Sequence, residues 1–329
     1  MPSFEKIDYF LRPSKQVERK LIIEALQKIS KAGHFIHEYT YLGLGSIFYV
    51  DFLLFHKYLL IDNMICAERF NYPKRMDFNK PYEFINLTMK PVGEVIPSIN
   101  RETPHLVWLD YDFTLDEDVL SDIRKCLHVL APGSIILITV VSDLYNLTNL
   151  IDPIEKKEMN EHQQKQAIVT ILNELIGSHY GSEIEIKDIA PTRLPTVMST
   201  ALRNHINSCT SIRGDIEFLQ LFNFQYRDGM NMLTLGGIIG NEQTHKILED
   251  AGIYKLKFIT DAEEPIEISV PPLTVREKNW LEKNLSKLEQ HLLNNTDLPL
   301  DMPFEIKAEL VKNFVKYYRH YPFYYETLV

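Results

Sequence analysis

Short apolar segments without polar alternation constrain the fold of this chain more than any other feature. The segments at residues 63–70 (NMICAERF), 104–112 (PHLVWLDYD) and 135–141 (IILITVV) are nearly continuous apolar runs. Strands with one face in water alternate polar and apolar residues, whereas strands buried on both faces do not. Segments with helical spacing, at 14–32 and 115–130, alternate with them. The pattern predicts an α/β fold in which helices cover both faces of a parallel sheet.

The sequence of the second half of the chain predicts that the last strands of the sheet pair antiparallel. Two β-rich runs, at 216–226 and 230–240, flank Asp228-Gly229, and an Asp-Gly pair between such runs indicates a β-hairpin. We therefore expect a Rossmann-like, doubly wound and mostly parallel sheet with a C-terminal antiparallel hairpin. The expected parts are an α/β domain at 1–241, which has a helical N-terminal segment at 1–33 and a helical insertion at about 151–212, and a helical C-terminal appendage at 242–329.

Several boundaries are predicted from local signals. Ser14 follows Pro13 and is expected to cap the first helix, because a serine oxygen accepts hydrogen bonds from the free amides there. Thr274 ends an extended connector, EISVPPLT, and precedes one helical pattern at 275–293. A last helix is expected at about 304–318.

Composition narrows the classes of partner and compartment. The formal charge of −10 argues against a general nucleic-acid coat, because binding a polyanion normally needs a basic surface. Three widely separated cysteines, with no CxxC pair, predict neither a disulfide framework nor a zinc cluster. The first six residues carry no apolar signal core, and no run of about 18 apolar residues could span a membrane. We expect a cytoplasmic protein that does not bind membranes.

Candidate binding residues fall at the carboxyl ends of the predicted strands, where open α/β sheets bind ligands. Gly43 and Gly45 end the first strand, where a backbone without side chains lets a ligand approach. Glu68 ends the second strand, and its carboxylate can accept hydrogen bonds from the hydroxyls of a ribose. Thr88 ends the third strand and Asp110 the fourth. Together these residues predict a nucleoside site.

The loop after the first strand bears on which nucleoside is bound. A dinucleotide fingerprint, Gly-x-Gly-x-x-Gly, would place a glycine at position 48, where this chain has Phe48. A bulky ring there disfavours the close approach of a phosphate. A phosphate-binding loop ending in Gly-Lys-Ser/Thr is also absent from the sequence. The remaining candidate is a nucleoside without phosphate, such as S-adenosylmethionine.

The segment from His34 to Gly240 resembles the class I (Rossmann-like) S-adenosylmethionine-dependent methyltransferases. The resemblance rests on LGLGS at 42–46, CAERF at 66–70, VWLDYD at 107–112 and LAPGS at 130–134. In that family the glycine loop lies beside the methionine moiety, the acid after strand two holds the ribose, and the strand-four acid lies near the transferred methyl group. The resemblance implies a cofactor site formed by Gly43, Gly45, Ser46, Glu68, Arg69, Thr88 and Asp110, with Arg69 or Phe70 packed on the adenine.

The chain departs from the family pattern at several positions. Tyr41 stands where an acid often precedes the loop, and Ile47 stands where the family has a third glycine. The Asn/Asp-Pro-Pro-Tyr/Phe motif of amino-methylating enzymes is missing from strand four. Asp143 and Asn146 are not adjacent, unlike the Asp-Asn pair of metal-dependent catechol-type enzymes, so no metal is predicted.

Catalysis is assigned to the acids of strand four. Methyl transfer is a direct displacement, so positioning contributes most, and a nearby base helps an oxygen or nitrogen nucleophile. Asp110 and Asp112 are the candidate catalytic residues, with Asp112 as the first candidate for the base and His56 as the second. Arg12 and Lys15 lie at the start of a helix, where they form either a solvated face or a site for an anionic substrate.

The sequence thus predicts an S-adenosylmethionine-dependent methyltransferase that acts on an oxygen of a small molecule. Two alternatives stay open: a nucleic-acid methyltransferase, and a protein of this fold that has lost catalysis and serves in binding. The aromatic tail at 316–329 (KYYRHYPFYYETLV) is expected to dock on the domain or across a homodimer, with base stacking as the alternative.

Overall fold

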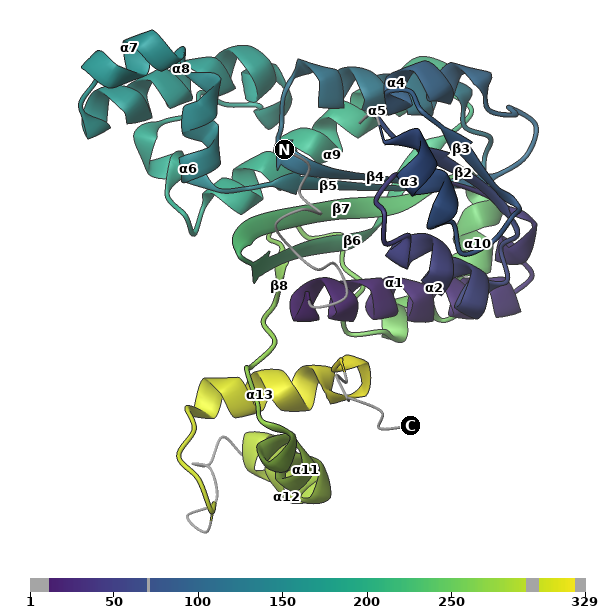
Figure 1. The fold of residues 1–329 in the computed structure, drawn as a ribbon, viewed down its shortest axis with the longest axis vertical. Coiled ribbons are helices and arrows are strands. Elements are labelled where there is room, and N and C mark those ends of the chain that lie inside the picture. The colour runs from purple at the N-terminus through teal and green to yellow at the C-terminus, as the bar shows by residue number, and fades with distance from the viewer. Residues whose placement is uncertain (1–11, 70–71, 294–301, 323–329) are drawn as a thin grey trace.

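One eight-stranded sheet organises the part of the chain that the computed structural model describes, residues 12–69, 72–293 and 302–322. The strand order is β3-β2-β1-β4-β5-β7-β6-β8 (Figure 1). Phe70 and the end of the aromatic tail lie outside the described residues. The strands are β1 Thr40–Leu44, β2 Asn63–Ala67, β3 Ile85–Thr88, β4 His105–Thr114, β5 Ile135–Val141, β6 Glu217–Asp228, β7 Met230–Gly240 and β8 Ile266–Ile268.

The strand pairing confirms the predicted fold class. Strands β1 to β5 pair in parallel, while β7 runs antiparallel to both β5 and β6. Every residue of β5 is buried, as expected for a strand covered on both faces. The hairpin forms where it was predicted, because Gly229 joins β6 to β7 with a φ of 95°, which glycine adopts without strain.

Helices cover both faces of the sheet and create two apolar cores. Residues of α1, α2 and α10 pack on one face around Trp108, and residues of α4, α5 and α9 pack on the other around Leu109, with α8 packed behind α9. Figure 1 shows α4, α5 and α9 above the sheet and α1 and α2 below it. The helices are α1 Pro13–Lys31, α2 Val50–Leu59, α3 Pro73–Phe78, α4 Val92–Val95, α5 Glu117–Val129, α6 Leu144–Leu147, α7 Pro153–Glu158, α8 Glu161–Tyr180, α9 Leu194–Arg213 and α10 Glu242–Asp250.

The segment expected as a helical insertion, at about 151–212, contains one helix, α9, that packs directly on the sheet. Helix α9 contacts α5, β6 and β7, and α8 packs against α9. Met198 and Leu202 of α9 are fully buried in the same core as the strand residues. Helix α9 therefore covers the hairpin end of the sheet, whereas α7 and α8 extend away from it (Figure 1).

Ser14 does not cap the first helix, so that prediction was wrong. The helix begins one residue earlier, at Pro13, and Arg12 at the N-cap position makes no side-chain cap hydrogen bond. Instead, the Asp228 carboxylate accepts a hydrogen bond from the Ser14 amide at 3.2 Å and from the Lys15 amide at 2.8 Å. Because Asp228 ends β6, the tip of the hairpin caps the helix from outside.

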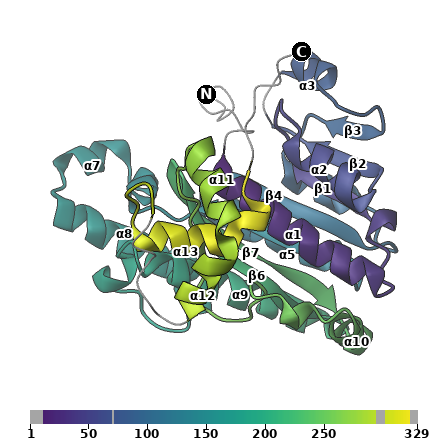
Figure 2. The same cartoon turned by 90° about the horizontal axis from the view of Figure 1, so that it is seen from below.

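The last part of the chain extends the sheet before it becomes helical. Strand β8, from the expected connector, pairs in parallel with β6. The pattern at 275–293 was expected as one helix but forms α11 (Val275–Lys283) and α12 (Leu285–Leu293), separated at Asn284. Together with α13 (Ala308–Tyr317) these helices form a layer beyond α1 with its own apolar core (Figures 1 and 2).

Polar contacts connect this C-terminal layer to the sheet and to α1. The Tyr317 hydroxyl donates to the Glu267 carbonyl at 2.7 Å, next to the sheet edge. The Lys20 ammonium of α1 donates to the His320 carbonyl at 3.2 Å, and the His320 ring contacts the Glu24 carboxylate at 2.7 Å. We propose on this basis that residues beyond β8 form an appendage docked on α1.

Candidate functional site

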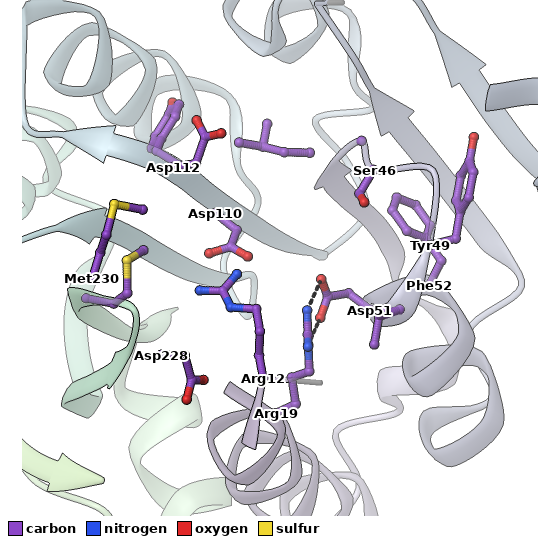
Figure 3. Close-up of a pocket in the computed structure, with 15 residues that line it drawn as sticks. Arg12, Arg19, Ser46, Tyr49, Asp51, Phe52, Asp110, Asp112, Asp228 and Met230 are labelled. Carbon is purple, nitrogen blue, oxygen red and sulfur yellow. Dashed lines mark hydrogen bonds and ion pairs between the residues drawn. The ribbon is translucent and has the colours of Figure 1, made fainter. Parts of the chain in front are cut away.

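Two adjoining cavities lie at the carboxyl ends of the parallel strands, where open α/β sheets bind ligands. The larger cavity encloses about 290 Å³ and is lined by Glu68 and Phe113. The smaller encloses about 50 Å³ between the start of α1, the loop after β1 and the β6–β7 hairpin (Figure 3). A ligand that fills the larger cavity reaches the smaller one where the two share their lining. The residues that line both cavities are Leu44, Gly45, Asp110, Tyr111 and Asp112.

The two glycines of the first loop serve different purposes. A β-carbon on Gly43 would overlap the hydroxyl of Tyr41, whose ring crosses the glycine, and Gly43 lines neither cavity. A β-carbon on Gly45 would lie 2.7 Å from Cβ of Glu68 and 2.9 Å from its Oε2. Gly45 thus keeps space open at the cavity wall, whereas Gly43 makes room for an internal side chain.

Glu68, the expected ribose ligand, has a fixed position at the larger cavity. The residue is 5 % exposed, and its backbone amide donates to the Thr88 carbonyl at 3.0 Å. Thr88 lines neither cavity, so the structure gives it a supporting position behind Glu68. Arg69 lines the larger cavity with its guanidinium 5.1 Å from the ring centre of Phe113. A carboxylate and a cation–aromatic pair thus stand side by side in one wall.

The structure places Lys15 away from solvent and against two carboxylates. Its ammonium lies 2.8 Å from Oδ1 of Asp110 and 2.8 Å from Oε2 of Glu18, and the Lys15 and Glu18 side chains are 0 % exposed. The ammonium also lies 4.3 Å from the ring centre of Trp108. Because protein groups surround its ammonium, Lys15 cannot bind an anionic substrate, which was one of the two interpretations of the sequence.

The charges around Asp110 act on its protonation. Burial alone would raise the pKa of Asp110, but the Lys15 ammonium and the Arg12 and Arg19 guanidinium groups outweigh burial and hold the pKa below its ordinary value. Burial raises the pKa of Glu18, with the Lys15 ammonium opposing it. Asp110 is thus a carboxylate at neutral pH, and 18 % of its side chain stays exposed where the cavities meet.

A second buried ion pair fixes the loop side of the smaller cavity. Arg19 of α1 contacts Asp51 in the first turn of α2 through two hydrogen bonds, and the Arg19 side chain is 1 % exposed (Figure 3). Burial alone would lower the pKa of Arg19, but the Asp51 carboxylate outweighs burial, so the pKa of Arg19 lies above its ordinary value. Arg12, a predicted substrate residue, is half-buried and lines the smaller cavity. The first turns of α1 therefore form one wall of that cavity.

Asp112 and His56, the two candidate bases, lie in different places. Asp112 is exposed and lines both cavities, so its carboxylate can reach a molecule bound in either. His56 lines neither cavity; its ring contacts the Ile61 carbonyl at 2.9 Å and lies against Tyr82. The structure therefore separates His56 from the site and leaves Asp112 as the candidate base.

The loop between β1 and α2 has a left-handed residue that is not glycine. Tyr49 has a φ of 47°, a conformation that costs roughly 1–2 kcal/mol for a residue with a β-carbon. Its ring is 1 % exposed, and its hydroxyl donates to the Met76 carbonyl at 3.1 Å. Ser46, the predicted cofactor contact in this loop, lines the smaller cavity rather than the larger one. Side-chain packing thus holds Tyr49 in a conformation that glycine adopts more easily.

Sequence reasoning missed several residues of the smaller cavity. Asp51, Arg19 and Asp228 line it, and Met230 and Met232 of β7 close its hairpin side. An acid in the first turn of a helix, such as Asp51, and an acid at a hairpin tip, such as Asp228, were signals present in the sequence. Their ordinary explanations are a favourable helix dipole and a turn preference, so neither signal indicated a site.

No group of three or more metal-binding side chains lies together among the residues that the structure describes. The three cysteines, Cys66, Cys126 and Cys209, are unpaired. Within the same described ranges, none of the helices has the length and apolar character needed to cross a bilayer.

Comparison with solved structures finds distant likenesses. Trm1 from Pyrococcus horikoshii in complex with S-adenosyl-L-methionine is 11% identical, over 92% of this chain and 81% of that one, with a TM-score of 0.42. Spermidine synthase from Thermotoga maritima is 11% identical, over 78% and 71%, with a TM-score of 0.35. The N-methyltransferase NodS from Bradyrhizobium japonicum WM9 in complex with S-adenosyl-l-homocysteine is 7% identical, over 66% and 87%, with a TM-score of 0.33. Scores this low carry no argument about substrate.

A family model matches the sequence itself. No curated protein matches the chain in sequence. The family described as "Putative O-methyltransferase" matches residues 7–329, nearly the whole chain. The strand order, with its antiparallel β7 between β5 and β6, agrees with the fold that the sequence resemblance implied. The chain therefore belongs to this O-methyltransferase family, within the class I S-adenosylmethionine-dependent methyltransferases.

Proposed function

We propose that the protein transfers a methyl group from S-adenosylmethionine to an oxygen of a small molecule. The observation that carries this proposal is the junction of the two cavities at Gly45, Asp110 and Asp112. The larger cavity has the features of a nucleoside site, and the carboxylates of Asp110 and Asp112 lie where the smaller cavity joins it. A cofactor in the first cavity and an acceptor in the second would meet at that junction.

The residues of the larger cavity fit the cofactor. The space in front of Gly45 is one that a β-carbon would fill, and Glu68 beside it is a buried carboxylate suited to two ribose hydroxyls. Arg69 and Phe113 offer flat surfaces for an adenine. When bound, the cofactor supplies a methyl group activated on a sulfonium. Asp110, negatively charged at the junction, would favour that positive charge.

The smaller cavity suggests the shape of the acceptor. Its volume is about 50 Å³, against the roughly 10–15 Å³ that a single water needs on the same measure, so the cavity has room for a small group. The formal charge of −10 favours a small molecule over nucleic acid, because binding a polyanion normally needs a basic surface. Asp112 would take the proton of an acceptor hydroxyl, which leaves an oxygen nucleophile for the displacement.

Isothermal titration calorimetry tests the cofactor assignment. The wild type is titrated with S-adenosylmethionine and S-adenosylhomocysteine, beside Glu68→Gln and a control, Glu83→Gln, whose exposed side chain lines neither cavity. We expect Glu68→Gln to bind about 10- to 100-fold more weakly, because hydrogen bonds to a charged group contribute about 1.5–3 kcal/mol. The control should bind like the wild type.

Two results would contradict parts of the proposal. If the wild type binds neither compound, the cofactor assignment fails. If Glu68→Gln binds as the wild type does, Glu68 is not the ribose ligand. Transfer of labelled methyl groups to a panel of small hydroxyl compounds then tests turnover, and cofactor binding without any transfer would favour a protein that has lost catalysis.

A further inference from the structure

We infer that Lys15 is a positioning residue, which acts through Asp110 by fixing the carboxylate of Asp110 at the junction where a bound cofactor meets the acceptor. This inference rests on the proposed function, because cofactor affinity is its readout. It departs from the sequence interpretation, in which Lys15 contacts an anionic substrate.

The contacts of Lys15 leave no position for a substrate anion. Its ammonium lies 2.8 Å from Asp110 and 2.8 Å from Glu18, with both the Lys15 and the Glu18 side chains 0 % exposed. The ring of Trp108 covers another side, with its centre 4.3 Å from the ammonium. An ammonium has three hydrogen-bond donors and no acceptor, and here protein groups take up its directions. Its charge therefore acts inside the protein.

Lys15 is also fixed at its backbone end. Its amide donates to the Asp228 carboxylate at 2.8 Å, next to the Ser14 amide, so the first turn of α1 is attached to the hairpin tip. One turn later, Arg19 holds Asp51 of α2. Because Lys15 is held at both its amide and its ammonium, its side chain has little freedom to move. The Asp110 carboxylate that it contacts is therefore held in place as well. Asp110 is thereby oriented by α1 rather than by its own strand alone.

The charge of Lys15 has a specific consequence for Asp110. Of the cations that lower the pKa of Asp110, Lys15 has the largest effect. Without it, only Arg12 and Arg19 would oppose the effect of burial, so the Asp110 carboxyl would hold its proton more strongly and more often present a neutral group to the cofactor. A neutral Asp110 would lose most of its attraction for a positively charged ligand. The charged and titratable groups that face Asp110 are Arg12 at the N-cap of α1, Lys15, Glu18 and Arg19 of α1, Tyr41 of β1, Asp51 of α2, Asp112 of β4, and Tyr226 and Asp228 of β6.

The test is a pH series of S-adenosylmethionine affinity by calorimetry between about pH 5.5 and 8.5. Each variant's affinity is divided by that of the wild type at the same pH, because the α-amino group of the cofactor itself titrates in this range. In the wild type Asp110 stays charged throughout. Relative to the wild type, Lys15→Met should bind about tenfold or more weakly at pH 5.5 than at pH 8.5, because Asp110 then takes a proton within the range. Lys15→Met/Asp110→Asn should be weak and flat, which assigns the titration to Asp110 and not to another group.

Two further variants keep the test decisive. Lys20→Met removes a lysine of the same helix whose ammonium bonds to His320, outside both cavities, and should behave like the wild type. Lys15→Arg keeps the charge and should restore a flat profile even at lower affinity. Should Lys15→Met fail to fold, the Lys15→Arg profile decides, since a fall in affinity toward acid pH would then contradict the inference.

The possible failures can be told apart. A wild type that binds no S-adenosylmethionine overturns the proposed function, and with it this inference. A wild type that binds normally, beside a Lys15→Met variant with the same affinity and a flat profile, overturns the role of Lys15 and leaves the proposed function standing. A Lys15→Met variant that is weaker by the same factor at every pH also overturns it, because a merely structural loss predicts that result.

Discussion

Gly45 and Glu68 lie so close that a β-carbon at position 45 would stand 2.7 Å from the β-carbon of Glu68. The two residues end neighbouring parallel strands, β1 and β2. The missing side chain of Gly45 therefore determines whether the Glu68 carboxylate can keep its place at the wall of the larger cavity.

The two loop glycines should respond differently to alanine. Gly45→Ala should weaken S-adenosylmethionine binding by about tenfold or more, since it displaces Glu68 or fills the cavity wall. Gly43→Ala should instead destabilise the fold by about 1–3 kcal/mol, because the new methyl group overlaps Tyr41 in a packed core. Calorimetry and thermal unfolding measured on both variants separate the effects. The assignment fails if Gly43→Ala impairs binding more than Gly45→Ala does.

Asp112→Asn should lower methyl transfer by about 10²- to 10⁴-fold, the usual contribution of a general base. Cofactor affinity should stay within about threefold of the wild type, because Asp112 is exposed and Asp110 keeps its charge. The measurement is kcat/KM with the best acceptor of the hydroxyl panel, beside calorimetry. Exposed Asp62, which lines neither cavity, supplies a matched Asp→Asn control. Unchanged turnover in Asp112→Asn would remove it as the base.

Protein stability should fall as the pH drops below about 6.5, in part because of His205 of α9. Burial lowers the pKa of His205, and its Nε2 donates to the Leu120 carbonyl at 3.0 Å. His179 lies 3.1 Å from its Nδ1, and the Arg124 guanidinium also disfavours a charge on the ring. The unfolded chain takes up a proton near pH 6.5 while the folded protein resists it, so acid favours unfolding.

Thermal unfolding at pH 7.5 and pH 5.0 checks this sign. His205→Gln should be less stable than the wild type at pH 7.5 by about 1–3 kcal/mol, because it disturbs a buried hydrogen bond. The stability that His205→Gln loses between pH 7.5 and pH 5.0 should nevertheless be smaller than the loss in the wild type. His37→Gln, at a largely exposed histidine, should keep the wild-type difference. An equal acid loss in His205→Gln and the wild type would show that other groups cause it.

The fold was predictable because its signals are local. The uninterrupted burial of strands such as β5 follows from their apolar sequence, and Asp228-Gly229 forms the predicted turn. The position of Glu68 at the larger cavity was predictable as well, since a strand end fixes the edge of the sheet at which a side chain lies. These features depend on neighbouring residues or on the general geometry of parallel sheets.

The remaining features depend on contacts between distant segments. Nothing near Ser14 indicates that Asp228 would cap the helix in its place. Lys15 looked exposed because cations at a helix start usually are, and only the position of Asp110 beside it explains its burial. The break at Asn284 interrupts a pattern that continues across it. Local propensity describes the segment and not its partners, so these predictions could not be made from the sequence alone.

The cap that Asp228 places on α1 also has a consequence for the order of events during synthesis. The Asp228 carboxylate accepts a hydrogen bond from the amide of Ser14, and the two residues are 214 positions apart in the sequence. The ribosome therefore makes the start of α1 long before its cap exists. Until the hairpin emerges and joins the sheet, the turn that carries Lys15 and Arg19 lacks its attachment. A shortened polypeptide that stops before β6 would contain the glycine loop, Glu68 and Asp110, yet it could not assemble the wall of the smaller cavity. The smaller cavity is thus completed late, by one of the latest parts of the sheet to be made.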